Sequence, residues 1–147
     1  MPAVRVGPAL VAMWRLHRTL YRVSGGRLGA RFGGFGVLLL TTTGRKSGRP
    51  ARVTLSYLED DGQPVVVGSY AGEDRHPAWY LNLQAHPVAE VMRGGETARV
   101  RARTTIGEER QRLLARFVAI DPAYGEYQRR TSRQLPVVVL EPADDAA

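Results

Sequence analysis

Short apolar runs with β-branched residues recur along the chain, and their alternation with polar positions predicts strands. The first pair covers residues 37–43 and 52–57, on either side of a basic loop. Turn signals at Asp60-Asp61-Gly62 and at Gly94-Gly95 predict hairpins. The remaining predicted strands are residues 64–69, 88–92, 97–104 and 135–141. The pattern thus predicts about six, mostly antiparallel strands.

A second pattern, with apolar residues three or four positions apart, predicts helices. Residues 8–23 show it with Trp14 on the apolar side, and a glycine-rich connector over residues 26–36 follows. Pro77 begins a short helix that runs through residue 84, because proline fits the first helical turn. Further helices are predicted after the capping-box sequence at residues 105–108 and after Asp121-Pro122.

These elements predict one α+β domain with flanking helices around a barrel-like sheet. The length of 147 residues suits a single domain. We divide the chain into an N-terminal amphipathic helix with its connector, residues 1–35, the barrel domain, residues 36–142, and an acidic tail, residues 143–147.

The loop between the first two strands carries the clearest candidate chemistry. Hydroxyl and cationic side chains fall close together in it, at Thr42, Thr43, Arg45, Lys46, Ser47 and Arg49. Gly44 and Gly48 allow a tight turn that brings backbone N–H groups up to a ligand. The loop contains no carboxylate, so it predicts an anion site with phosphate as the usual ligand. An ordinary solvated basic turn is the alternative.

Composition excludes several classes of function. The chain has no cysteine, and its three histidines lack metal-ligand spacing, so neither disulfides nor a metal site is expected. No apolar run is long enough to span a membrane and no signal peptide is indicated, so a cytoplasmic location is expected. The segment 8–23 also suits the inner membrane surface, which leaves a peripheral contact open.

The net charge of +7 is concentrated at the N-terminal side, where residues 1–58 hold ten basic residues and no acidic one. Such asymmetry favours an anionic partner. Nucleic acid is the less favoured partner, because the arginine-rich segments lack interleaved aromatic residues and a helix-turn-helix signal. We therefore expect a small anionic ligand and no nucleic acid.

Four segments together resemble a known family: TTTGRKSGRP, VVVGS, HPAWYLNLQAHP and LPVVVLEP. In this order and spacing they are similar to the deazaflavin-dependent nitroreductase family of actinobacteria, over residues 36–142. The resemblance implies a split β-barrel, related to the flavin-mononucleotide-binding oxidoreductases, that binds coenzyme F-420. It further implies hydride transfer from the reduced coenzyme to a small-molecule electron acceptor, either a quinone, an enone or a nitro compound.

By resemblance, the basic loop holds the phosphate and polyanionic tail of the coenzyme, and the VVVGS segment lines its ring. Trp79 flanks the ring, although a tryptophan in a short buried helix is also typical of a core. The cofactor-binding residues implied are Thr43, Gly44, Arg45, Lys46, Ser47, Gly48, Arg52, Val67, Gly68, Ser69, Trp79 and Asn82.

No catalytic side chain is strictly required, because the coenzyme carries the hydride. The candidates for proton donation or substrate positioning are Tyr124, Tyr127 and Ser69. For the acceptor, the resemblance implies Ser56, Tyr57, Tyr124 and Tyr127. The chain departs from the family by having arginines at positions 129 and 130, where a third tyrosine is expected, which puts activation of nitro drugs in doubt.

Two other readings of the same residues stay open. One is a carrier protein that binds the deazaflavin, or flavin mononucleotide (FMN) as the less favoured cofactor, without turnover. The other is a basic domain that binds nucleic acid. The oligomeric state is also open between a monomer and a homodimer, with a slight preference for the homodimer.

Overall fold

The computed structural model describes residues 31–32 and 34–143. The helix predicted over residues 8–23 and most of the acidic tail lie outside this range, and so does the predicted membrane contact. Within the described residues, no helix is long and apolar enough to cross a membrane.

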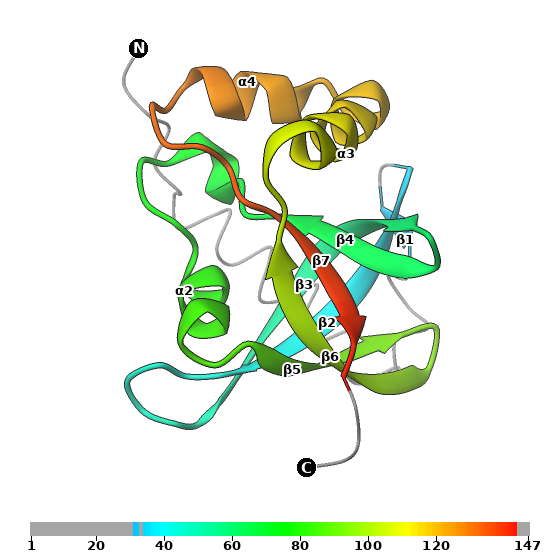
Figure 1. Cartoon of the computed structure of the whole chain (residues 1–147), viewed down its shortest axis with the longest axis vertical. Helices are drawn as coiled ribbons and strands as arrows, with labels where there is room; N and C mark the ends of the chain where they lie inside the picture. The colour runs from blue at the N-terminus through cyan, green and yellow to red at the C-terminus, as the bar shows by residue number, and fades with distance from the viewer. Residues whose placement is uncertain (1–30, 33, 144–147) are drawn as a thin grey trace.

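The strands form one antiparallel sheet that closes on itself (Figure 1). Its order is β1-β2-β3-β4-β7-β6-β5, and β2 also pairs with β5, so six strands make a barrel. The strands are β1 Arg31–Phe32, β2 Phe35–Thr43, β3 Pro50–Asp60, β4 Gln63–Val67, β5 Val88–Arg93, β6 Glu96–Thr104 and β7 Val137–Pro142. The predicted α+β split barrel of about six strands is confirmed.

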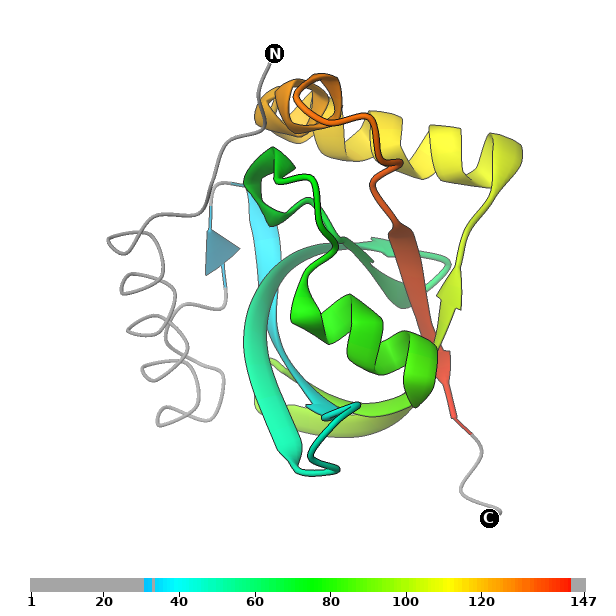
Figure 2. The same cartoon turned by 90° about the vertical axis from the view of Figure 1, so that its left-hand side faces the viewer.

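In the part of the chain that the structure describes, three α-helices and a short 3-10 helix cover this barrel. Helix α2 lies across one open end, while α3 and α4 lie together on another side (Figure 2). The helices are η1 Tyr70–Gly72, α2 Ala78–Ala85, α3 Gly107–Ile120 and α4 Ala123–Arg129. Pro77 is the N-cap of α2, within one residue of the predicted start.

The barrel interior is one hydrophobic core, which α2 closes. Alternate residues of β2, such as Leu38 and Leu40, point inward and are completely buried. Trp79, Tyr80 and Leu83 of α2 pack against the same cluster. These residues form one buried face, whereas Ala78, Gln84 and Ala85 on the opposite side of the helix are exposed. The expectation that this helix is covered on more than one side is therefore wrong.

A second core lies between the outside of the barrel and helix α3. Leu113 and Phe117, four residues apart on α3, are completely buried there against β4 and β7. Val65 and Val139 supply the sheet side and are paired in register. The continuous VVV runs in β4 and β7 follow from this arrangement, since these strands are buried on both faces.

The predicted capping box at residues 105–108 is wrong. Thr105 is buried, and its hydroxyl donates to the carbonyl of Val137 at 2.8 Å instead of capping α3. Ile106 occupies the N-cap and makes no side-chain cap hydrogen bond. The same buried β7 carbonyl also accepts the backbone N–H of Thr105 at 2.9 Å, so this residue joins β7 to the start of α3 through both of its donors.

Candidate functional site

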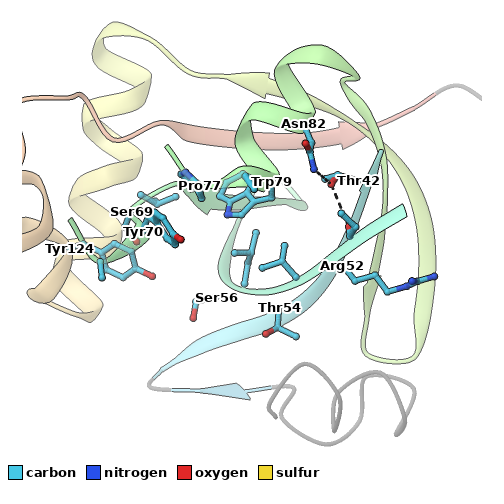
Figure 3. Close-up of a pocket in the computed structure, with 16 residues that line it drawn as sticks. Thr42, Arg52, Thr54, Ser56, Ser69, Tyr70, Pro77, Trp79, Asn82 and Tyr124 are labelled. Carbon is cyan, nitrogen blue, oxygen red and sulfur yellow. Dashed lines mark hydrogen bonds between the residues drawn. The ribbon is translucent and has the colours of Figure 1, made fainter. Parts of the chain in front are cut away.

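A cleft of about 410 Å³ opens beside β3 (Figure 3). Its walls are β3, the η1 turn, the start of α2 and one side chain of α4. The lining residues are Thr42, Ala51, Arg52, Val53, Thr54, Leu55, Ser56, Val67, Ser69, Tyr70, Ala71, Pro77, Ala78, Trp79, Asn82 and Tyr124.

Among the described strands, none pairs with the first part of β3 on the side away from β2, and the cleft lies there. Residues 50–57 of β3 pair with β2, whereas β4 pairs only with residues 58–60. The backbone edge of residues 51–56 therefore borders the cleft. Such an edge offers backbone N–H and C=O groups to a flat heterocycle with its own donors and acceptors.

The basic loop lies at the end of β2 and β3. Its turn is closed by hydrogen bonds from the Gly44 N–H to the Arg49 carbonyl and from the Gly48 N–H to the Gly44 carbonyl, both 2.8 Å. The Ser47 hydroxyl accepts from the Arg49 N–H at 3.1 Å. A Cβ at position 44 would come within 2.7 Å of that hydroxyl oxygen, so the close turn favours glycine there.

The donors of this loop are available to an anion. Within the described residues, Arg45, Lys46 and Arg49 form no ion pair. The N–H groups of Lys46 and Ser47 likewise have no acceptor in this part of the chain. A phosphodiester with a carboxylate tail would complement both sets of donors, so the residues present fit such a group.

Asn82 connects the loop, helix α2 and β2. Its Oδ1 accepts from the backbone N–H and from the Nη1 of Arg45, both at 3.1 Å. Its Nδ2 donates to the Thr42 hydroxyl at 3.0 Å, and this hydroxyl donates to the Ala51 carbonyl at 3.4 Å. The bonds of Asn82 and Thr42 at the edge of the cleft are shown in Figure 3. One buried amide thus fixes Arg45 of the loop beside this edge.

The middle of the cleft is more apolar. Trp79 lines it, yet this side chain is also 93% buried in the barrel core, as its 7% exposure shows. Trp79 is therefore a core residue that also lines the cleft; its contact with a coenzyme ring stays a prediction. Val67 ends β4, and the chain leaves the strand at Gly68, whose N–H donates to the Pro136 carbonyl at 2.8 Å. This exit places Ser69 at the cleft.

Tyr124 forms the far end of the cleft, opposite the basic loop. Its ring contacts Phe35 and Phe117, with centroids 5.6 and 5.1 Å away. Burial, followed by the neighbouring Tyr127 and Asp121, raises the pKa of the Tyr124 phenol well above its ordinary value, although an interaction with Ser56 opposes this. The phenol therefore keeps its proton at neutral pH and can donate a hydrogen bond into the cleft.

The structure brings together some of the predicted site residues and separates others. Arg52, Ser56, Val67, Ser69, Trp79, Asn82 and Tyr124 line the cleft. Tyr57 lies outside the lining, against Arg93 and Gly36. Tyr127 is also outside it, half-buried beside Tyr124, at 5.8 Å between ring centroids. The loop residues Thr43, Gly44, Arg45, Lys46, Ser47 and Gly48, and also Gly68, are not part of the lining.

Sequence reasoning missed the η1 turn as a wall of the cleft. Tyr70 and Ala71 both line it, and both have left-handed backbone angles. Gly72 follows with φ +78°. The glycine was the one visible signal, because a left-handed alanine or tyrosine is set by tertiary contacts and not by local propensity.

Comparison with known proteins agrees with this geometry. The profile of the F420H(2)-dependent quinone reductase family matches residues 13–142. An F420H(2)-dependent quinone reductase of Mycobacterium tuberculosis is 39% identical over 134 residues, which cover 88% of this chain and 90% of that protein.

Two solved structures share the fold. An F420-H2 dependent reductase is 39% identical with a TM-score of 0.66, over 71% of this chain and 93% of that one. A protein solved as a domain-swapped dimer is 33% identical with a TM-score of 0.69, over 92% of this chain and 100% of that one. With its split barrel, open-edged cleft and basic loop, the chain belongs to the F420H(2)-dependent quinone reductase family.

Proposed function

We propose that the cleft beside β3 binds reduced coenzyme F-420 and a quinone, and that the chain catalyses hydride transfer between them. Family membership confirms the expected F-420-dependent quinone reductase; the assignment of residues is the proposal. The observation that carries it is the basic loop, whose cations form no ion pair within the described residues, at one end of a cleft bordered by the edge of β3.

In this proposal the basic loop binds the tail of the coenzyme. Arg45, Lys46 and the N–H groups at the loop tip supply charge-assisted hydrogen bonds to phosphate and carboxylate oxygens. Arg52 lies between the loop and the cleft, so it extends the cationic surface toward the ring. The edge of residues 51–56 and Ser69 then border the ring.

When bound, the reduced coenzyme supplies the hydride. The protein contributes orientation and a water-poor surface, which Val53, Leu55 and Trp79 provide in the cleft. Reduction of a quinone to a hydroquinone also consumes protons. The protonated phenol of Tyr124 and the hydroxyl of Ser69 line the end of the cleft away from the loop, and either group can donate such a proton.

The tail assignment predicts the effect of replacing Arg45 and Lys46 together by alanine. Affinity for the coenzyme should fall more than tenfold, because a hydrogen bond to a charged group is worth about 1.5–3 kcal/mol. The measurement is a spectroscopic titration of the purified protein with oxidised and reduced coenzyme.

The control removes the same charge elsewhere, as Arg112→Ala with Arg116→Ala on α3, both paired with Asp60. Affinity should then stay within threefold of the wild type. An unchanged affinity in the loop double variant would contradict the tail assignment. Coenzyme binding without quinone-dependent oxidation would favour the carrier alternative, and a preference for FMN in the same titration would replace the cofactor.

We also propose that the chain forms a homodimer. Support comes from the 33% identical relative, which was solved as a domain-swapped dimer and whose whole chain matches this one. Light scattering during size exclusion should then give twice the chain mass of 16.2 kDa. A mass of 16.2 kDa at micromolar concentration would assign a monomer instead.

A further inference from the structure

The η1 turn at the cleft has an unusual backbone. Tyr70, Ala71 and Gly72 have φ angles of 44°, 53° and 78°, so three consecutive residues are left-handed. Non-glycine residues avoid this region because Cβ approaches the carbonyl oxygen. Such a turn persists only where surrounding contacts impose it.

The turn is also pressed against helix α4. A Cβ on Gly72 would lie 3.0 Å from the carbonyl oxygen and 3.1 Å from the Cα of Tyr127. Because the opposing atoms belong to the helix backbone, they cannot move aside as a flexible side chain would. The contact with α4 prevents the turn from moving away from the cleft. Tyr70 and Ala71 line the cleft on the other side of the turn, and Tyr70 is labelled in Figure 3.

The guanidinium of Arg133 joins both ends of this turn. On the leading side, Nη1 donates to the Gly68 carbonyl at 3.0 Å and Nη2 to the Ser69 carbonyl at 2.8 Å. On the far side, Nε donates to the Glu73 carbonyl at 2.7 Å. The donors of this planar group lie on three separate nitrogens in fixed directions, so they reach carbonyls on both sides of the turn, whereas the three donors of a lysine share one nitrogen.

The fourth contact of Arg133 is His76, whose Nδ1 lies 3.1 Å from Nη1. Burial and the charge of Arg133 lower the pKa of His76, so its imidazole is neutral and can accept this hydrogen bond. The imidazole also faces the Tyr80 ring, with ring centroids 5.0 Å apart. The contact therefore extends the fixed segment to the residue before Pro77.

Arg133 is itself held in place. Its backbone N–H donates to the Thr131 hydroxyl at 3.2 Å, and this hydroxyl donates to Asp74 at 2.8 Å. Its carbonyl accepts from Gln128 Nε2 at 2.7 Å. Arg133 is thus oriented from α4 and from the segment before β7, and it does not itself line the cleft.

We propose that Arg133 is a positioning residue that keeps the η1 turn in its left-handed form and so fixes the wall of the cleft against which the coenzyme and its acceptor bind. Arg133 acts through its hydrogen bonds to the carbonyls of Gly68, Ser69 and Glu73, and it contacts neither reactant. The part that concerns the reactants rests on the function proposed above; the part that concerns the turn does not.

The test is hydrogen exchange of the coenzyme-free protein, compared between wild type and Arg133→Met. Amide exchange in residues 69–73 should accelerate at least tenfold, while exchange in β2 and β6 stays within twofold. Affinity for the coenzyme should fall at least fivefold. Arg116→Met is the matched control, because Arg116 also donates to a backbone carbonyl, that of Glu59, but on the exposed side of α3.

Arg133→Lys, which keeps the charge, should give an intermediate exchange rate and provides a second variant if Arg133→Met does not fold. Unchanged exchange in residues 69–73, or acceleration spread evenly over the barrel, would overturn the proposal in either variant. Failure of the proposed function is distinguishable: a wild-type protein that binds no coenzyme would refute that function, and the exchange result would still decide the role of Arg133 in the turn.

Discussion

Replacement of Phe117 by alanine is expected to lower the free energy of unfolding by about 3–5 kcal/mol, the usual cost of truncating a buried phenylalanine. Phe117 is completely buried, and its ring stacks on Phe35 with centroids 5.3 Å apart. The cavity would open between α3 and the barrel, where the close-packed β4 and β7 cannot collapse into it. Urea denaturation followed by circular dichroism measures the change.

Phe117→Ala should also affect the cleft, because the Tyr124 ring packs on Phe117 with ring centroids 5.1 Å apart. We expect looser positioning of the phenol and a lower kcat with quinone. Val118→Ala is the control on the same helix, since Val118 is only partly buried; it should cost about 1 kcal/mol or less. A loss below 1.5 kcal/mol in Phe117→Ala would contradict the importance of this second core.

Replacement of Asn82 by alanine is expected to lower the free energy of unfolding by about 2–3 kcal/mol, at roughly 1 kcal/mol for each hydrogen bond lost. Asn82 makes three such bonds and is buried, so neither Thr42 nor the amide position can be rehydrated easily. Because two of these bonds hold Arg45, coenzyme affinity should fall as well. Thermal unfolding and the coenzyme titration measure the two effects.

Asn82→Asp separates these effects. It keeps an acceptor for Arg45 but loses the donor to Thr42, so coenzyme affinity should be retained better than stability. Gln84→Ala, on the exposed side of the same helix, should change neither quantity measurably. Equal stability of Asn82→Ala and wild type would refute the anchoring role of the amide.

The local pattern of apolar and polar residues was sufficient to predict most of the fold. The β-branched runs at residues 37–43 and 64–69 became β2 and β4, because strands buried on both faces need continuous apolar sequence. The glycines of the basic loop predicted a tight turn with free donors, and Gly44 does pack closely on Ser47. These features depend on neighbours in sequence, which is why they could be predicted.

Features that depend on distant residues were not predictable. The sequence around Thr105 satisfies the capping-box rule, but the carbonyl of Val137, 32 residues away, takes its hydroxyl. Arg133 is one arginine among twenty, and its proposed role depends on carbonyls sixty or more residues earlier. The cleft lining likewise follows from which edge of β3 is unpaired, a property of the closed sheet.

The position of β7 between β4 and β6 governs the order in which the molecule can assemble. Val65 of β4 pairs with Val139 of β7, and Val100 of β6 pairs with Pro142 of β7. The facing edges of β4 and β6 therefore stay unpaired until β7 has been synthesised. On the ribosome, the strands from β2 to β6 must therefore remain an incomplete sheet with two open edges. The η1 wall of the cleft is hydrogen-bonded to Arg133, just before β7, so this wall can form only after that residue has been translated.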